Sequence, residues 1–505
     1  MKMSASRTKK FLYNSMSMLL LQIVTMIVGF ITPHIMLQYY GSEINGLVSS
    51  ITQFITYFNL VEAGLSSAAI YALYKPLADN DHKKISGVVT AAKRFYNISG
   101  YIFVSLTVGL ALIYPLFIKT NTLMPFEVGL LVLVLGVSGA LEFFTLGKYR
   151  ALLSADQKTY VISIATILSI ILNCLIIVIC AYFHMNIVLL KGIALLSVFL
   201  RSFILWIYSL KNYSYIDYKE IPNNKALDKR WSALYLQILG AVQVGAPVVL
   251  ATLFTDLKMV SVYSIFNMVI GGINGLLGIF TSGLSASFGE VIAKNETKVL
   301  QKSYSEFEYI YYSLVAIVYG VSAITLMPFI KLYTSGILDT NYNLPLVGAL
   351  FIINGLLYNL KTPQGMLVIS AGLYKETKWQ TTIQGCIVVV GGIVLAPRLG
   401  LNGILIASIL SNLYRNIDLI FFIPKWVTKL PIKNSLLRII LVGIALFIIW
   451  IPFNYIVISI SSYITWLFYA ISITIYSIFV VGLMGFIFDH KNMFGLLKRF
   501  KRLRG

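Results

Sequence analysis

The chain has 505 residues, of which 58% are hydrophobic and 12% are charged, and its mean hydropathy is +0.83. Soluble domains carry about twice that share of charged residues, so the composition excludes an ordinary soluble protein. The formal net charge of +21 would favour nucleic-acid binding in a soluble chain. Here the basic residues stand between apolar runs, so membrane topology explains them better and no nucleic-acid partner is expected.

Apolar runs of about twenty residues recur along the chain, which is the length that spans ~30 Å of hydrocarbon. The basic N-terminus leads into the first run without a small-residue cleavage pattern, so we expect an uncleaved first helix. The fold class that we predict is an all-α integral membrane protein with about 14 transmembrane helices. Their predicted ranges are 15–37, 46–74, 97–118, 126–147, 160–182, 188–210, 232–254, 260–288, 307–330, 345–369, 380–396, 401–423, 437–460 and 464–488.

The distribution of Lys and Arg predicts the orientation of these helices. If the N-terminus is cytoplasmic and the helices alternate strictly, cytoplasmic segments hold 32 of the 40 Lys and Arg residues. Five lie on the opposite side and three lie within predicted spans, where Lys191 and Arg438 at the ends of spans are counted with the adjoining segments. Because basic residues concentrate in cytoplasmic loops, we expect both termini in the cytoplasm.

Short matches between the two halves of the chain indicate an internal repeat. Leu-Gln-Ile at 21–23 recurs at 236–238, and the other matches pair Gly64 with Gly283, Ser154 with Ser370, and Asn186 with Asn402. The offsets lie between 215 and 219 residues, and each match falls at the corresponding helix of a six-helix unit. Since six is even, the two units would be parallel repeats.

This repeat predicts the division of the chain. We expect an N-terminal six-helix lobe at 1–210, a cytoplasmic linker at 211–231 and a second six-helix lobe at 232–423. Residues 424–505 would add helices thirteen and fourteen and a basic cytoplasmic tail.

A charged side chain inside the membrane costs roughly 2.5–3.5 kcal/mol on insertion scales, so each one is a candidate functional group. Glu62 lies in the middle of the second predicted helix, and Arg201 and Lys361 lie in the sixth and tenth. Arg415 and Asp418 are three residues apart in the twelfth helix, where they could neutralise each other. Arg201 and Lys361 could instead extend toward the nearest membrane surface.

Polar and bending residues add to these candidates. Asn59 shares a helix face with Glu62, and Asn267 and Asn274 could line a polar path through the eighth predicted helix. We expect helix bends where proline removes a backbone donor inside a predicted span. The residues at which we predict such bends are Pro33, Pro247 and Pro363, in the first, seventh and tenth predicted helices.

No arrangement typical of an enzyme or a metal site is present in the sequence. Cys174, Cys180 and Cys386 lie inside apolar runs, and the four histidines are scattered. We therefore predict a binding and transport protein without a metal or other cofactor. A coupling ion, either H⁺ or Na⁺, stays open.

Three stretches resemble a known family. They are Tyr39–Leu47, Glu62–Ala68 and Tyr149–Lys158, and they resemble Wzx-type flippases of lipid-linked oligosaccharides in the multidrug/oligosaccharidyl-lipid/polysaccharide (MOP) exporter superfamily. The resemblance implies two six-helix lobes around a cavity in a prokaryotic plasma membrane. It also implies export of an undecaprenyl-diphosphate-linked repeat unit, by alternating access, for surface polysaccharide assembly.

The resemblance suggests roles for the candidate residues. Arg201, Lys361 and Arg415 would hold the diphosphate, and Glu62 would bind a coupling ion or a sugar. Helices thirteen and fourteen would form a groove for the lipid tail. Membrane lipids, a polysaccharide polymerase and chain-length machinery are the implied partners.

Three alternative functions stay open. A lipid II flippase of the same superfamily differs little in sequence pattern. A cation or drug antiporter would need an acidic lumen and usually ends after twelve helices. A membrane polysaccharide polymerase or acyltransferase would call for a long external loop or a buried catalytic histidine.

Overall fold

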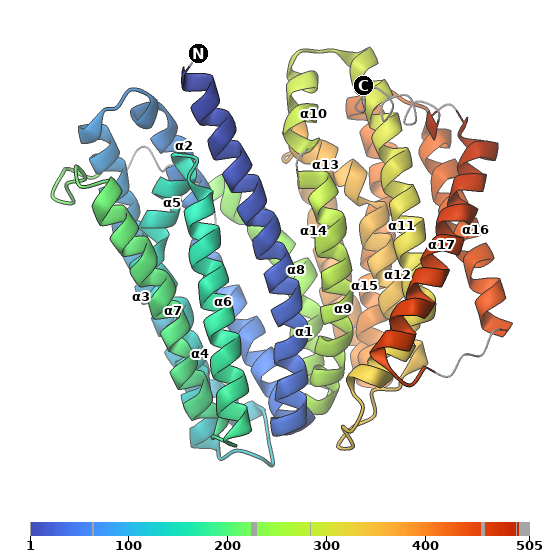
Figure 1. The fold of residues 1–505 in the computed structure, drawn as a ribbon, viewed down its shortest axis with the longest axis horizontal. Coiled ribbons are helices and arrows are strands. Elements are labelled where there is room, and N and C mark those ends of the chain that lie inside the picture. Colours follow the sequence, from blue (N-terminus) through green and yellow to red (C-terminus); the bar gives the residue numbers. More distant parts are fainter. Residues whose placement is uncertain are drawn as a thin grey trace. The chain divides into compact units, whose positions relative to one another are not determined.

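The structure is a computed structural model that describes residues 2–62, 65–223, 230–282, 284–455, 460–490 and 492–493. All regular secondary structure within these ranges is helical (Figure 1). Twelve helices in the described part of the chain are long and apolar enough to cross a bilayer. The chain is therefore a multi-pass membrane protein with an all-α fold, as its composition predicts.

The count of twelve differs from the predicted fourteen at two places. Helix α1 (Lys2–Phe58) contains the first predicted span and the first part of the second, and Gly41, with φ 77° and ψ 175°, interrupts its helical backbone. The apolar segment Leu12–Glu62, which includes most of α1, would extend about 77 Å as one straight helix, more than twice the ~30 Å hydrocarbon core of a bilayer. At the second place the span predicted at 345–369 divides into α12 (Pro345–Leu360) and α13 (Thr362–Ser370).

The first compact unit consists of Met1–Thr252 and Asp256–Ser261. Within it, α3 packs on α4, α4 on α7, α7 on α6 and α6 on α1. Its elements after α1 are η1 (Asn59–Glu62), α2 (Leu65–Ala78), α3 (His82–Phe117), α4 (Pro125–Leu141), the π-helical turn η2 (Glu142–Leu146), α5 (Gly147–Ala155), α6 (Thr159–Tyr182), α7 (Ile187–Asn212) and α8 (Arg230–Phe254), whose last residues belong to the second unit.

The second compact unit consists of Leu253–Thr255 and Val262–Gly505. In this unit α11 contacts α12, α16 and α17, and α15 contacts α12 and α14. The elements are α9 (Leu257–Ser282), whose first residues belong to the first unit, α10 (Leu284–Ala293), α11 (Thr297–Tyr333), α12, α13, α14 (Lys378–Leu399), α15 (Leu401–Ile423), η4 (Pro424–Thr428), α16 (Ile432–Tyr455) and α17 (Tyr463–Phe488). The lobe boundary at 211–231 stays a prediction, and residues 224–229 lie outside the described part.

Helix ends repeat along the chain at the offset that the sequence matches give. A residue with left-handed backbone geometry ends a helix at three places in the first half and again 215 or 216 residues later. The pairs are Asn80 with Asn295, Gln157 with Gly372, and His184 with Gly400. At the first pair, the next amide bonds a carbonyl five residues back in both copies, from Asp81 to Pro76 at 2.9 Å and from Glu296 to Val291 at 3.2 Å. The same helix-stop motif therefore recurs in both halves.

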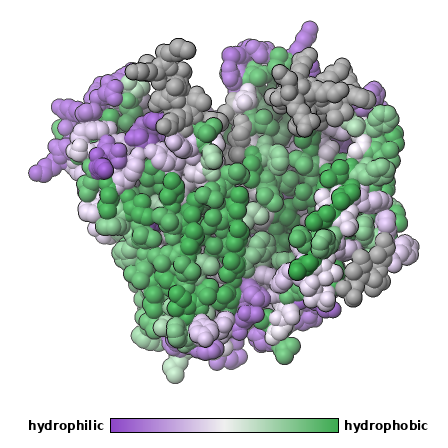
Figure 2. Space-filling view, in the orientation of Figure 1, coloured by the Kyte–Doolittle hydropathy of each residue, from purple (hydrophilic) through white to green (hydrophobic). Residues whose placement is uncertain are grey.

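Large apolar side chains cover the outside of the helices. Examples from the first unit are Leu112, Leu116 and Leu175, each more than half exposed. Figure 2 shows a broad hydrophobic surface over α4 and α6, with hydrophilic residues gathered at the helix ends. A soluble protein does not leave an apolar surface of this extent in water, so the surface is one that faces lipid.

Glycine allows one very close backbone approach inside the first unit. A Cβ on Gly46 in α1 would lie 1.7 Å from the carbonyl oxygen of Leu257, the first residue of α9. Contact this close between helices needs a residue without a side chain.

We expect Gly46→Ala to lower the thermal unfolding temperature of the detergent-purified protein, because a helix must move to admit the methyl group; overpacking of this kind costs about 1–3 kcal/mol. Gly29→Ala in the same helix is the matched control, since a Cβ there meets nothing within 4 Å. Equal unfolding temperatures for the two variants would contradict the close approach.

Candidate functional site

Charged side chains of the first unit meet at an interruption between α4 and α5. Glu142 begins the π-helical turn η2, and Arg201 of α7 donates from its terminal nitrogen to the Glu142 carboxylate. Arg150 of α5 lies 3.5 Å from the second carboxylate oxygen. Glu142 is thus shared between two arginines. The Nε of Arg201 is buried and has no hydrogen-bond partner among the described residues.

The expected helix around Glu62 is wrong in detail. Asn59–Glu62 forms a 3-10 turn, η1, where we predict a continuous helix at 46–74. Residues three apart in a 3-10 helix are eclipsed, so Asn59 and Glu62 still share a side of the chain. Asn59 is exposed, whereas Glu62 is half-buried and lies within the influence of the charges of Arg150 and Glu142. Glu62 therefore belongs with the charged cluster of the first unit.

Lys361 lies at the break between α12 and α13 in the second unit. Its ammonium group donates to Asn412 Oδ1 at 2.7 Å and lies 5.0 Å from the centre of the Tyr358 ring. Asn412 in turn donates to Asn354 Oδ1 at 2.8 Å. Among the described residues, the groups that contact this ammonium are neutral, so its positive charge is not cancelled locally.

Arg415 also lies on α15, one turn after Asn412. It is only 7% exposed, and its guanidinium donates to Asp418 at 2.6 Å, the pair that their spacing allows. The carboxylate neutralises this arginine, whereas Lys361 keeps an amide as its partner. Of the two basic residues predicted in this unit, Arg415 is therefore neutralised by a neighbouring carboxylate and Lys361 is not.

The predicted asparagines of α9 have different surroundings. Asn274 accepts a hydrogen bond from Tyr319 at 3.1 Å and one from Asn359 at 2.7 Å, and Tyr311 donates to Asn359 at 2.9 Å. Asn267 is exposed and takes no part in this network. The two residues are seven apart on α9 and so share a face of this helix, and the polar path that they would line stays a prediction.

The prolines also differ from the prediction of simple bends. Pro33 and Pro247 lie inside α1 and α8, where we expect them. Pro363 lies in the first turn of α13 and follows the one-residue interruption of the helix at Lys361. Proline suits a first turn because the amide that it lacks would be unpaired there anyway.

A buried ion network was missed by the sequence reasoning. Arg438 of α16 donates to Glu308 of α11 at 2.7 Å and to Asp489, just after α17, at 3.0 Å. Glu308 is 1% exposed and Arg438 8%. Tyr304, Gln364 and Ser435 also donate to Glu308. Both charged residues fall at the first positions of predicted spans, where they resemble ordinary boundary residues, so the sequence gives no signal of their pairing.

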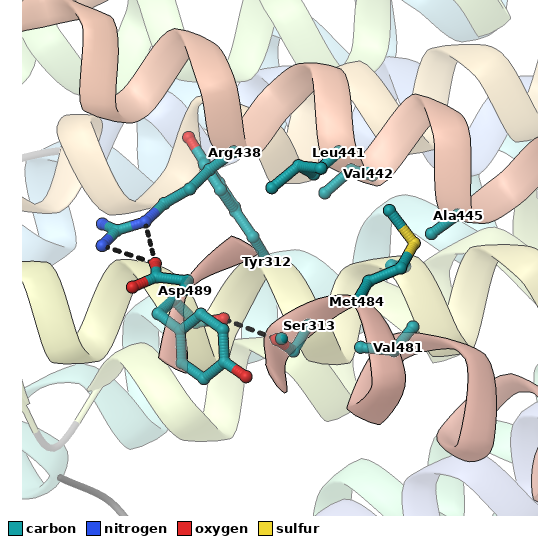
Figure 3. Close-up of a pocket in the computed structure, with 12 residues that line it drawn as sticks. Tyr312, Ser313, Arg438, Leu441, Val442, Ala445, Val481, Met484 and Asp489 are labelled. Carbon is teal, nitrogen blue, oxygen red and sulfur yellow. Dashed lines mark hydrogen bonds and ion pairs between the residues drawn. The ribbon is translucent and has the colours of Figure 1, made fainter. Parts of the chain in front are cut away.

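A pocket lies beside this network between α11, α16 and α17. Figure 3 shows the Arg438–Asp489 pair at one end and mostly apolar side chains along the rest. Val442 on α16 and Val481 and Met484 on α17 are among the lining residues. The pocket thus combines a polar end with an apolar wall. Three or more His, Cys, Asp or Glu side chains grouped as a metal site are not found within the described ranges.

Comparison with known proteins gives the fold. No family model matches the chain, and no curated protein is similar in sequence. A solved structure described as the lipid II flippase MurJ in an inward closed conformation has a TM-score of 0.73 at 15% identity and covers 94% of this chain and 99% of its own.

Two further solved structures belong to the same superfamily. A MATE family multidrug transporter of the MOP superfamily, inward-facing, has a TM-score of 0.66 at 16% identity over 84% of this chain and 95% of its own. A MOP superfamily transporter from Pyrococcus furiosus, described as having a binding pocket of reversed polarity, has a TM-score of 0.52 at 16% identity over 85% and 96%. The chain therefore has the fold of MOP superfamily transporters.

We expect Arg438→Met to destabilise the protein strongly, because it leaves the Glu308 carboxylate buried without a cation. Breaking one side of a buried pair costs about 3–5 kcal/mol. The measurement is the thermal unfolding temperature of the purified protein in detergent.

The double variant Arg438→Met with Glu308→Gln is the control, because it also removes the most deeply buried charge that the single variant leaves unpaired. It should unfold at a higher temperature than the single variant. A double variant less stable than Arg438→Met would contradict this account.

Proposed function

We propose that this protein is a flippase that moves an undecaprenyl-diphosphate-linked oligosaccharide from the cytoplasmic to the outer leaflet of a prokaryotic plasma membrane. Both termini would be cytoplasmic, and movement would occur by alternating access. The sugar-diphosphate head cannot cross hydrocarbon unaided, whereas the lipid tail need not leave it. The transporter fold and the buried cations support this proposal.

The observation that carries the proposal is the environment of Lys361. A lysine within a membrane helix costs free energy unless a partner compensates its charge. Lys361 has Asn412 and a tyrosine ring as partners, and a carboxylate is not among its contacts in the described part of the chain. A diphosphate is a ligand that would complete this site, since lysine binds phosphate as a point charge.

The first unit offers a second cationic group. Arg201 and Arg150 share the single carboxylate of Glu142, and Arg201 retains a buried Nε–H. Arg415 contributes less, because Asp418 neutralises it. We propose that Lys361 and Arg201 hold the anionic head of the substrate in turn, and that Glu62 takes up a coupling ion or a sugar hydroxyl.

The pocket between α11, α16 and α17 fits the lipid part of such a substrate. Apolar side chains line its wall, and the chain continues past the twelfth predicted helix into α16 and α17. We propose that one stretch of the prenyl tail occupies this pocket. Because a solved structure of similar fold is described as a lipid II flippase, lipid II is the nearest alternative substrate. Lipid II differs from the proposed substrate in its sugar head.

An antiporter for cations is the second candidate within this fold. It would use carboxylates to attract its cargo. Glu308, the most deeply buried carboxylate named above, is occupied by Arg438, Tyr304, Gln364 and Ser435. The described membrane-buried groups therefore favour an anionic substrate.

The decisive experiment follows the leaflet on which the complete lipid-linked unit accumulates. In a deletion strain that makes surface polysaccharide, we expect accumulation on the inner leaflet, relieved by the intact gene. Lys361→Ala should reduce this relief at least about tenfold, since one charge-assisted contact to phosphate is lost. Lys361→Arg should retain most of it.

Lys294→Ala is the matched control, because Lys294 is an exposed lysine at the end of α10 paired with Glu290. It should export normally at equal membrane abundance. Accumulation of complete units on the outer leaflet in the deletion strain would replace the flippase proposal with the polymerase alternative.

The tail pocket can be tested separately. We expect Val481→Phe to reduce export and to weaken binding of the lipid-linked substrate, because a ring at this position fills the pocket. Leu483→Phe adds the same ring on the exposed side of α17, where Leu483 is 50% exposed, and should leave export unchanged. Equal effects of the two variants would argue against tail binding in this pocket.

A further inference from the structure

Two lysines of the first unit converge on one aromatic ring. Lys93 of α3 lies 4.9 Å from the centre of the Tyr218 ring, and Lys148 of α5 lies 5.1 Å from the same centre. Lys148 also lies 4.8 Å from the centre of the Tyr149 ring. We refer to Lys93 and Lys148 as the lysine pair and to Tyr149 and Tyr218 as the tyrosine pair. The distance between the two ammonium nitrogens therefore cannot exceed the sum of their distances to the centre of the Tyr218 ring.

The lysine pair lacks an anionic partner in the described part of the chain. The ion pairs within 4.0 Å there involve other lysines and arginines. Burial, and then the charge of Lys93, lower the pKa of Lys148 to about 8. Like charges held close together without a counter-ion repel each other, so an anion that binds both ammonium groups stabilises the arrangement.

The site is built on ordered elements. The loop at 213–223 follows the first turns of α3, where Ser86 accepts from the Asp217 amide at 3.1 Å and the Asn223 amide bonds Gly87 at 3.1 Å. Tyr149 is buried in a cluster with Leu152 and Val89, and Tyr218 packs against this cluster. The hydroxyls of the tyrosine pair are close enough for each to affect the pKa of the other. The rings that the lysine pair approaches are therefore held in place.

The lysine pair lies at the depth of lipid head groups. Along the helix path, Lys148 is about 35 Å from Pro125 at the start of α4, and Lys93 is about 36 Å from Phe117 at the end of α3. Both distances exceed the ~30 Å of hydrocarbon, and both are measured from the same end of the α3–α4 hairpin. Each lysine is thus placed just beyond the apolar layer, where lipid phosphates lie.

We propose that the lysine pair and the tyrosine pair form a binding site for the phosphate group of a membrane lipid. Lysine ammonium groups bind phosphate oxygens as point charges, and a phenol can donate a further hydrogen bond. The phosphate has two sources within a membrane, an acidic phospholipid and a prenyl diphosphate. In the orientation proposed above the site faces the cytoplasmic leaflet, but binding here does not depend on transport.

The test is calorimetric titration of the full-length protein in detergent with three probes. They are geranyl diphosphate, dihexanoyl phosphatidylglycerol and inorganic phosphate. We expect the affinity of at least one lipid probe to be about tenfold or more lower for the double variant Lys93→Gln with Lys148→Gln than for the unchanged protein. The probe that loses affinity identifies the source of the phosphate.

Matched variants separate this site from general electrostatics. Lys83→Gln with Lys375→Gln removes the same charge from exposed lysines elsewhere and should bind as the unchanged protein does. The double variant Lys93→Arg with Lys148→Arg keeps both positive charges and should retain binding. Retained binding here shows that a loss in the glutamine variant arises from the loss of charge and not from misfolding. Binding should also weaken between pH 7 and pH 9, because Lys148 loses its proton while the raised pKa values of Tyr149 and Tyr218 keep both phenols neutral. Lys148→Arg should weaken less over this range.

Three results would overturn the proposal. They are the absence of binding by both lipid probes, an equal loss of affinity in the control variant, and binding of inorganic phosphate as tight as that of the lipid probes. None of them bears on the leaflet assay, so failure here and failure of the proposed flippase activity are distinguishable.

Discussion

Polar groups inside a bilayer must find their partners within the protein, and this constraint governs most of the structure. A continuous helix satisfies its own backbone, so the chain is helical wherever it crosses the apolar layer. A helix that is interrupted frees backbone groups and needs help from its neighbours. At η1 the carbonyl of Val61 accepts from Ser99 on α3, and at the α12–α13 break the carbonyl of Leu360 accepts from Tyr312 on α11.

The same interruptions hold the charged residues that define the candidate site. Glu62 lies in η1, Glu142 begins η2 and Lys361 separates α12 from α13. A side chain at such a break can leave the usual helix face and reach a neighbouring element. This geometry explains how Glu142 meets an arginine on α7 and how Lys361 meets an asparagine on α15. The breaks therefore supply polar sites without exposing backbone to lipid.

One charged network of the second unit is compensated more completely. Arg438 is held between Glu308 and Asp489, and it ties α11 to α16 and to the end of α17. A buried pair of this kind contributes little net stability but strongly opposes separation of its partners. The contrast with Lys361, whose partners are neutral, distinguishes a structural ion network from a cation that remains available to a ligand.

The sequence by itself determined the membrane class, the helical fold and the internal repeat. These properties depend on local composition and on spacing along the chain, which apolar runs of about twenty residues express directly. The repeat offset of the sequence matches reappears in the left-handed helix stops, because those stops are local motifs of a few residues.

Only the tertiary structure decided which charged residues meet. Arg201 and Glu142 are 59 residues apart, and Arg438 and Glu308 are 130 residues apart, so no local pattern links them. It also decided that the spans around Glu62 and Lys361 are interrupted, because the side chains that satisfy those breaks come from α3 and α11. Arg415 and Asp418 show the opposite case, since three residues on one helix suffice to predict their contact.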